Sequence, residues 1–206
     1  MLSRPMTESL ETRRHLSVSV ANNVLYVTGT AGNDTVVISQ GRDGRVTVSD
    51  NGKTAVLAPY AIDTVSIATG SGSDAVVLNH LVLPYGGSIQ TAGGADAVAF
   101  NGGNINGDLL VDTGADADIV AYTNSRIEGG VFKTGDGNDA VLAYDNAFLN
   151  YGTVQTGAGN DKVVLAKTVT FGYTTIDTGA GYDTFVGIRN SFAGGFNINA
   201  ELKIVL

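Results

Sequence analysis

The sequence lacks cysteine and tryptophan, has only three prolines, and only 16% of its 206 residues are charged. Without cysteine the chain has no disulfides, no thiolate metal ligands and no cysteine nucleophile. Glutamate is also scarce, with four residues against 16 aspartates. No apolar run approaches the roughly 18 residues that a transmembrane helix needs. These absences argue against a helical protein, a transmembrane segment and a disulfide scaffold.

Glycine and asparagine are abundant instead, at 28 and 16 residues, which favours a chain with many turns. Because 43% of the residues are hydrophobic, the chain can bury a core and is not a disordered polypeptide. The formal net charge is −8. This charge argues against nucleic acid and anionic membranes as partners, since both bind through Lys and Arg patches.

A glycine-rich segment of the form T-G-x-G-x-D-x-V occurs seven times, from GTAGNDTVVI at 29–38 to TGAGYDTFVG at 178–187. The successive aspartates are separated by 40, 22, 22, 21, 22 and 22 residues. A fixed period of this length is typical of solenoid proteins. The seven aspartates are Asp34, Asp74, Asp96, Asp118, Asp139, Asp161 and Asp183.

Apolar residues keep the same register in every unit, for example Val27 seven residues before Asp34 and Val36 two residues after it. Each unit thus contains short alternating segments separated by Gly and Asn turns, as in β-strands. We therefore predict an all-β fold: a parallel β-solenoid, β-helix-like or β-roll-like, with about 22 residues per coil and seven to eight coils. Stacking the coils would bury the apolar positions in one continuous core.

The ends of the chain depart from the repeat. Two alternating runs flank the turn Gly41–Gly44, which predicts a β-hairpin inserted in the first coil. The C-terminal segment FNINAELKIVL alternates without a glycine loop and is expected to cap the stack. We expect a disordered leader at 1–20 and one domain at 21–206, with a hairpin-bearing coil at about 36–66, regular coils at 67–190 and capping strands at 191–206.

The glycine loops are the candidate metal site. Stacked coils would place the aspartates roughly 5 Å apart, where like charges repel by about 1 kcal/mol even in water. Ca²⁺ binds carboxylate and carbonyl oxygens and would remove this repulsion. The alternative is a metal-free ladder in which each Asp accepts N–H bonds of its own turn. Asn could make the same turn but occupies none of the seven positions, which favours a role for the negative charge of Asp. Besides these seven aspartates, the predicted ligands are Gly70, Gly72, Gly94, Gly114, Asp116, Gly135, Gly137, Gly157, Gly159, Gly179 and Gly181.

These loops resemble the hemolysin-type, or repeats-in-toxin, calcium-binding repeats, whose nonapeptide is G-G-x-G-x-D-x-U-x. The resemblance covers residues 27 to about 190 and implies a β-roll that binds Ca²⁺. Thr replaces the first glycine in six copies, Ala92 and Asp116 replace later glycines, and the loop occurs only once per 22 residues. These departures leave one possible ion-binding edge instead of two.

The segment ESLETRRHLS at 8–17 resembles the L-E-x-R-x-L-L motif near the N-terminus of many exported or surface proteins of planctomycete-type bacteria. The matching residues here are Leu10, Glu11, Arg13, Arg14 and Leu16. The resemblance implies secretion or a cell-surface location, although no apolar core of an ordinary signal peptide is present.

A second candidate surface follows the loops. The residue three positions after each Asp is apolar yet should face outward, so stacking would form an apolar stripe suited to self-association or a surface partner. The alternative is that β-branched residues simply suit strands. The stripe consists of Val37, Val77, Ala99, Ala121, Leu142, Val164 and Val186.

No catalytic motif is present, and the only histidines are His15 in the leader and His80 at a turn. We therefore expect no catalytic residues and a non-enzymatic, secreted or surface-associated calcium-binding module with a structural or adhesive role. The alternative is a metal-independent scaffold that assembles through its apolar stripe, and a carbohydrate-active β-helix enzyme is a distant third.

Overall fold

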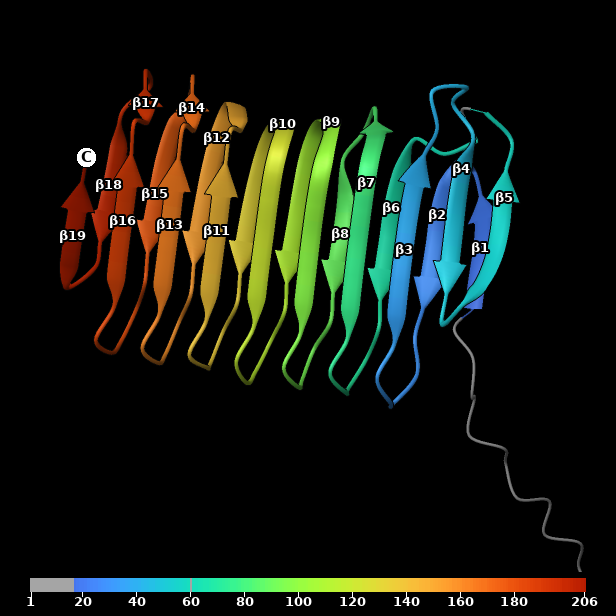
Figure 1. Cartoon of the computed structure of the whole chain (residues 1–206), viewed down its shortest axis with the longest axis horizontal. Helices are drawn as coiled ribbons and strands as arrows, with labels where there is room; N and C mark the ends of the chain where they lie inside the picture. Colours follow the sequence, from blue (N-terminus) through green and yellow to red (C-terminus); the bar gives the residue numbers. More distant parts are fainter. Residues whose placement is uncertain (1–16, 60) are drawn as a thin grey trace, which may run out of the picture.

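A computed structural model describes residues 17–59 and 61–206 of the chain. The described residues form 19 strands and no helix, wound into a parallel β-solenoid (Figure 1). The predicted fold class is therefore confirmed. The leader motif, from Leu10 to Leu16, lies outside the described residues.

Each coil contributes to three faces. The post-loop face holds the strands that directly follow the glycine loops, and every one pairs in parallel with its equivalent in the next coil. Val36 thus lies beside Val76, which lies beside Val98. The strands of this face are β3 (Thr35–Gln40), β7 (Ala75–Leu83), β9 (Ala97–Asp112), β10 (Ile119–Lys133), β11 (Ala140–Tyr144), β13 (Lys162–Ala166), β16 (Thr184–Ile188) and β19 (Leu202–Val205), the longer ones continuing onto the next faces.

The pre-loop face holds the strands that lead into the loops, and the short face lies between the two others. The pre-loop strands are β2 (Val24–Thr28), β6 (Thr64–Ala68), β8 (Gly87–Gln90), the ends of β9 and β10, β12 (Ala147–Gln155), β15 (Tyr173–Asp177) and β18 (Phe196–Asn199). The short face is built from the end of β7, the middles of β9 and β10, the start of β12, β14 (Val169–Thr170) and β17 (Ser191–Phe192).

The core is the set of inward side chains predicted from the repeat. Val76, Val98 and Val120 are buried in successive coils, as strand alternation requires. In the middle of the stack Tyr122 packs on Phe132, with ring centroids 4.8 Å apart. Dispersion contacts between the coils and removal of apolar surface from water stabilise the fold, because no coil buries these residues alone.

The 40-residue interval between the first two loops is a single coil with an insertion, because β3 pairs directly with β7. The insertion is more than a hairpin: β3, β4 (Val46–Asp50) and β5 (Lys53–Leu57) form an antiparallel meander. The described chain makes about six turns, fewer than the seven to eight predicted. The number is lower because the 40-residue interval forms one coil and not two, and because the terminal strands form only part of a coil.

The N-terminal boundary was predicted too late in the chain. Strand β1 (Ser17–Ala21) pairs antiparallel with β2, so residues 17–20 belong to the domain and not to a disordered leader. At the opposite end β17, β18 and β19 continue the parallel pairing and end the stack. Nothing in the described part of the chain is a helix able to cross a membrane.

Candidate functional site

The glycine loops stack along one edge of the solenoid, at the bottom of Figure 1. Gly70 and Gly72 have φ of 97° and 121°, a region that residues with a Cβ avoid. A Cβ on Gly94 would overlap the carbonyl oxygen of Gly72 in the coil before. The loops therefore touch through bare backbone, which explains why glycine recurs there.

Backbone hydrogen bonds join successive loops directly. The N–H of Gly137 donates to the carbonyl of Ala158 (2.8 Å), and the N–H of Ala158 donates to the carbonyl of Gly135 (3.1 Å). Five isolated parallel bridges, from Ser71–Gly93 to Ala158–Ala180, continue this pairing along the edge. Several loop carbonyls that a cation would need are thus already hydrogen-bonded to the neighbouring coil.

All seven predicted aspartates lie in one row inside this edge, and none is more than 2% exposed. Each backbone N–H in the row donates to Oδ1 of the aspartate in the next coil, for example Asp118 to Asp139 at 2.8 Å. The row ends where Asp183 donates to Oε2 of Glu201 at 3.0 Å. We call this row the aspartate ladder: Asp34, Asp74, Asp96, Asp118, Asp139, Asp161 and Asp183.

The second carboxylate oxygen separates the first aspartate from the others. Oδ2 of Asp34 accepts hydrogen bonds from the N–H (2.7 Å) and hydroxyl (3.1 Å) of Thr30. Oδ2 is buried without a hydrogen-bond partner among the described residues in Asp74, Asp96, Asp118, Asp139, Asp161 and Asp183. An unpaired buried polar atom is costly, so this column of oxygens is the chemically unusual feature of the edge.

The repeated threonine beside each carboxyl does not supply the missing bond. From Thr91 onward its hydroxyl hydrogen goes to a backbone carbonyl of the next coil, as from Thr134 to Thr156 (3.3 Å) and from Thr156 to Thr178 (3.0 Å). The hydroxyl of Thr69 has no hydrogen-bond partner among the described residues. Because a hydroxyl donates one hydrogen, the threonines from Thr91 onward offer Oδ2 only an acceptor lone pair. A protonated Oδ2 would therefore suit the ladder better than an ionised one.

Burial raises the pKa of Asp74, Asp96, Asp139 and Asp161. The strongest resolved effect is at Asp118, where burial, with the charges of Asp96 and Asp139 adding to it, raises the pKa to about 6. The backbone N–H bond to each of these carboxyls offsets part of the rise. In these five aspartates burial thus shifts the equilibrium toward the neutral carboxyl.

The predicted calcium ligands supply few free oxygens to any one gap between loops. Ca²⁺ takes six to eight oxygens, whereas each gap from Asp74 to Asp183 offers the unpaired Oδ2 atoms of two aspartates. Asp116 stands in a glycine position with φ of 80° and is exposed. Within the described ranges no group of three or more His, Cys, Asp or Glu side chains is placed to hold a metal.

The predicted apolar stripe is assembled in register. Val37, Val77 and Ala99 are direct neighbours in successive strands, and Ile204 extends the column beyond Val186. Leu142 and Ile204 are each 39% exposed. The outward positions on either side, from β3 to β19, carry one charged residue, Lys162. The post-loop face is therefore a flat, nearly uncharged surface.

A second corner turns each coil between the post-loop and short faces. The residue six positions after each ladder aspartate from Asp74 to Asp183 has a left-handed φ of 51–67°, although only one is glycine. The 22-residue spacing marks these positions in the sequence, but the residues at them have no chemical type in common. Its members are His80, Gly102, Asn124, Asp145, Lys167 and Arg189.

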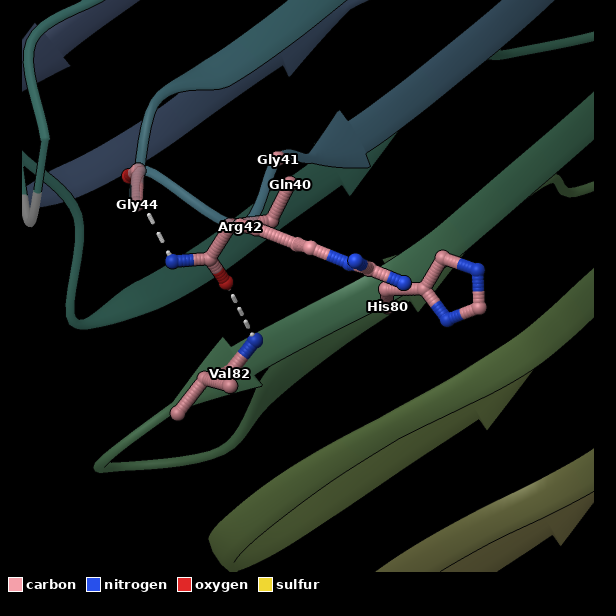
Figure 2. Close-up of a pocket in the computed structure, with 6 residues that line it drawn as sticks. All are labelled: Gln40, Gly41, Arg42, Gly44, His80 and Val82. Carbon is pink, nitrogen blue, oxygen red and sulfur yellow. Dashed lines mark hydrogen bonds between the residues drawn. The ribbon is translucent and has the colours of Figure 1, made fainter.

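A cleft of about 520 Å³ lies where the hairpin turn meets this corner. Figure 2 shows Arg42 extending from the turn toward the ring of His80, with Gln40 between the two elements. No carboxylate lines the cleft. Comparisons with family models, curated proteins and solved structures found no match to this chain.

Proposed function

We propose that this chain is a non-catalytic β-solenoid scaffold that folds without metal and pairs with a second copy through its post-loop face. The observation that carries the proposal is the in-register apolar column from Val37 to Ile204. A contiguous exposed apolar surface of this kind is typical of protein contact sites.

The size of the face supports a modest self-association. Eight strands at about 4.8 Å spacing and five residues at about 3.3 Å give a surface of roughly 550 Å². Two such faces would bury about 1,100 Å², just below the usual range of stable complexes and above most lattice contacts. We therefore expect a dimer with a micromolar dissociation constant.

Sedimentation velocity over a range of protein concentrations tests this proposal. The wild type should shift from monomer to dimer, and Leu142→Lys should remain monomeric because it places a charge in the middle of the face. Leu142 is part-exposed, so the variant should fold. The matched control is Thr175→Lys on the pre-loop face, which should dimerise normally. A wild type that is monomeric at every concentration, or equal effects of the two variants, would refute the proposal.

Calcium binding is the second candidate function, and the column of unpaired Oδ2 atoms is the observation that favours it. The ladder aspartates would hold the ion, and the ion would supply the positive charge that the buried carboxylates lack. Thermal melting at pH 7.5 with excess Ca²⁺ and with EDTA separates the two candidates. Equal melting temperatures are expected for the metal-free scaffold, whereas a large rise with Ca²⁺ would make calcium part of the fold.

We also propose that the scaffold acts outside the cell. The support is the leader motif from Leu10 to Leu16. Expression with and without residues 1–16 in a bacterium that carries such leaders, followed by fractionation, tests the location.

A further inference from the structure

We propose that the second-corner edge binds an acidic polysaccharide, with Arg42 and His80 holding one of its oxyanion groups in the cleft beneath the hairpin turn. The oxyanion is a carboxylate or a sulfate. This site is independent of the post-loop face, because it lies on the edge where the chain turns away from that face.

The cleft is held in shape by the protein itself. The side-chain oxygen of Gln40 accepts the N–H of Val82 at 2.7 Å, and its amide donates to the carbonyl of Gly44 at 3.5 Å (Figure 2). Within the turn Gly41 donates its N–H to the carbonyl of Arg45 at 2.9 Å. These bonds fix the hairpin turn against the strand that carries His80, so the Arg42 guanidinium and the His80 imidazole line one cleft.

The charges around the cleft favour an anion. Asp43 is the acidic residue next to Arg42 in the chain, and it pairs with Arg45 at 3.3 Å. None of the described carboxylates forms an ion pair with Arg42. The guanidinium therefore presents its donors to the cleft, and a planar oxyanion is the ligand that matches their geometry.

His80 is held in place by the backbone of its corner. Its φ of 54° is unusual for a residue with a Cβ and typically costs about 1 kcal/mol. Its ring lies over Gly102 in the next coil, where an added Cβ would come within 2.6 Å of Nδ1. The corner thus places an imidazole among the groups that line the cleft.

Cations continue along the same edge. Arg126 and Lys167 line a second, shallower cleft of about 400 Å³ together with Asn124 and one carboxylate, Asp145, and Arg189 lies in the next coil. Five coil steps separate His80 from Arg189, or about 24 Å at the usual strand spacing. A row of this length suits an extended polymer better than a single small ion.

The edge favours a sugar chain over nucleic acid. Its cations are sparse, roughly one for every two coils, and amides such as Asn124 and Gln40 lie between them and can bond hydroxyls. Single-stranded nucleic acid binds through aromatic platforms. The aromatic residue of this edge, Tyr144, is engaged by Lys167, whose Nζ lies 2.7 Å from its hydroxyl and 4.8 Å from its ring centroid.

The test is titration calorimetry of the full chain, in EDTA, with a uronic acid hexamer and with the same hexamer as its uncharged methyl ester. The charged hexamer should bind at least tenfold more tightly than the ester, and binding should weaken with added salt. Arg42→Ala should weaken it about tenfold, and Arg126→Ala several-fold. The matched control Lys133→Ala removes a charge outside this edge and should change affinity less than twofold.

Melting temperature and circular dichroism should be unchanged in Arg42→Ala, because the side chain is exposed. Equal binding of acid and ester, or equal losses in the Arg42 and Lys133 variants, would overturn the proposal. Tighter binding of a single-stranded DNA 12-mer than of the hexamer would assign the edge to nucleic acid and also overturn it.

Discussion

Each coil turns at the glycine loop and again at the second corner, and the two turns constrain the sequence to different degrees. At the loop the backbones of successive coils touch, and buried carboxyls bond across the gap, so Gly and Asp recur. At the second corner the same left-handed φ recurs while the residues run from His80 to Arg189. Packing therefore fixes the first turn, whereas the second is free to vary with what it contacts.

The largest expected effect is at the loop backbone. In Gly159→Ala the new Cβ would overlap the carbonyl oxygen of Gly137, so the loops would have to separate. We expect a loss of about 3 kcal/mol in the free energy of unfolding, measured by urea denaturation. The control is Gly52→Ala, at φ of 84° with open space around it, which should cost about 1 kcal/mol from strain alone. Equal losses would mean that strain, not contact between loops, selects glycine.

Next in size is the aspartate ladder itself. Asp139→Ala would leave the N–H of Asp118 buried without an acceptor, at a cost of about 1–3 kcal/mol. Asp139→Asn keeps a side-chain carbonyl and removes a buried charge, so its stability at pH 7.5 should equal or exceed that of the wild type. Urea denaturation of both variants gives the comparison.

The matched control at the second corner is Asp145→Asn, which should change stability by less than about 0.5 kcal/mol. If Asp139→Asn proves as damaging as Asp139→Ala, the ladder needs its negative charge and calcium becomes the better account of the loops.

A smaller effect should appear as pH changes. The pKa of Asp118 rises from 3.8 to about 6 on folding, so its contribution is complete below pH 3.8 and is lost as pH rises through 6. The melting temperature without calcium should therefore fall between pH 5 and pH 7.5. In Asp118→Asn this slope should be shallower, and a wild type that gains stability over the same range would contradict neutral carboxyls in the ladder.

The smallest effect is expected at the second corner. Asn124 has φ of 52°, which Gly adopts without strain, so Asn124→Gly should change the free energy of unfolding by no more than about 0.5 kcal/mol. Thermal melting measures it, with Asn124→Val as the strained counterpart. A large loss in the glycine variant would show that the second corner is as constrained as the loop.

The 22-residue period predicted the fold, because a constant repeat length lets equivalent residues of successive units pair side by side in parallel strands. Val76, Val98 and Val120 were expected in the core for this reason and are buried there. The boundary at β1 was missed because its antiparallel pairing with β2 has no counterpart in the repeat.

The loop chemistry was only partly predictable. That Asp139 lies in a row of aspartates follows from spacing, but the direction in which its two oxygens point does not. The bond from the Asp118 N–H to Oδ1 and the unpaired Oδ2 depend on side-chain rotation within the stack. The cleft at Arg42 could not be predicted either, since the inserted turn is placed over His80 by tertiary bonds from Gln40.

Each coil pairs in register only with the coils on either side of it, and this has a consequence for how the length of the chain can change. A deletion or duplication of one whole 22-residue unit, such as the step from Asp139 to Asp161, would leave every remaining loop, ladder bond and apolar column facing an equivalent partner. Removing or adding one unit should therefore change the length of the stack without changing its cross-section, while the inserted hairpin and its cleft stay attached to the first coil.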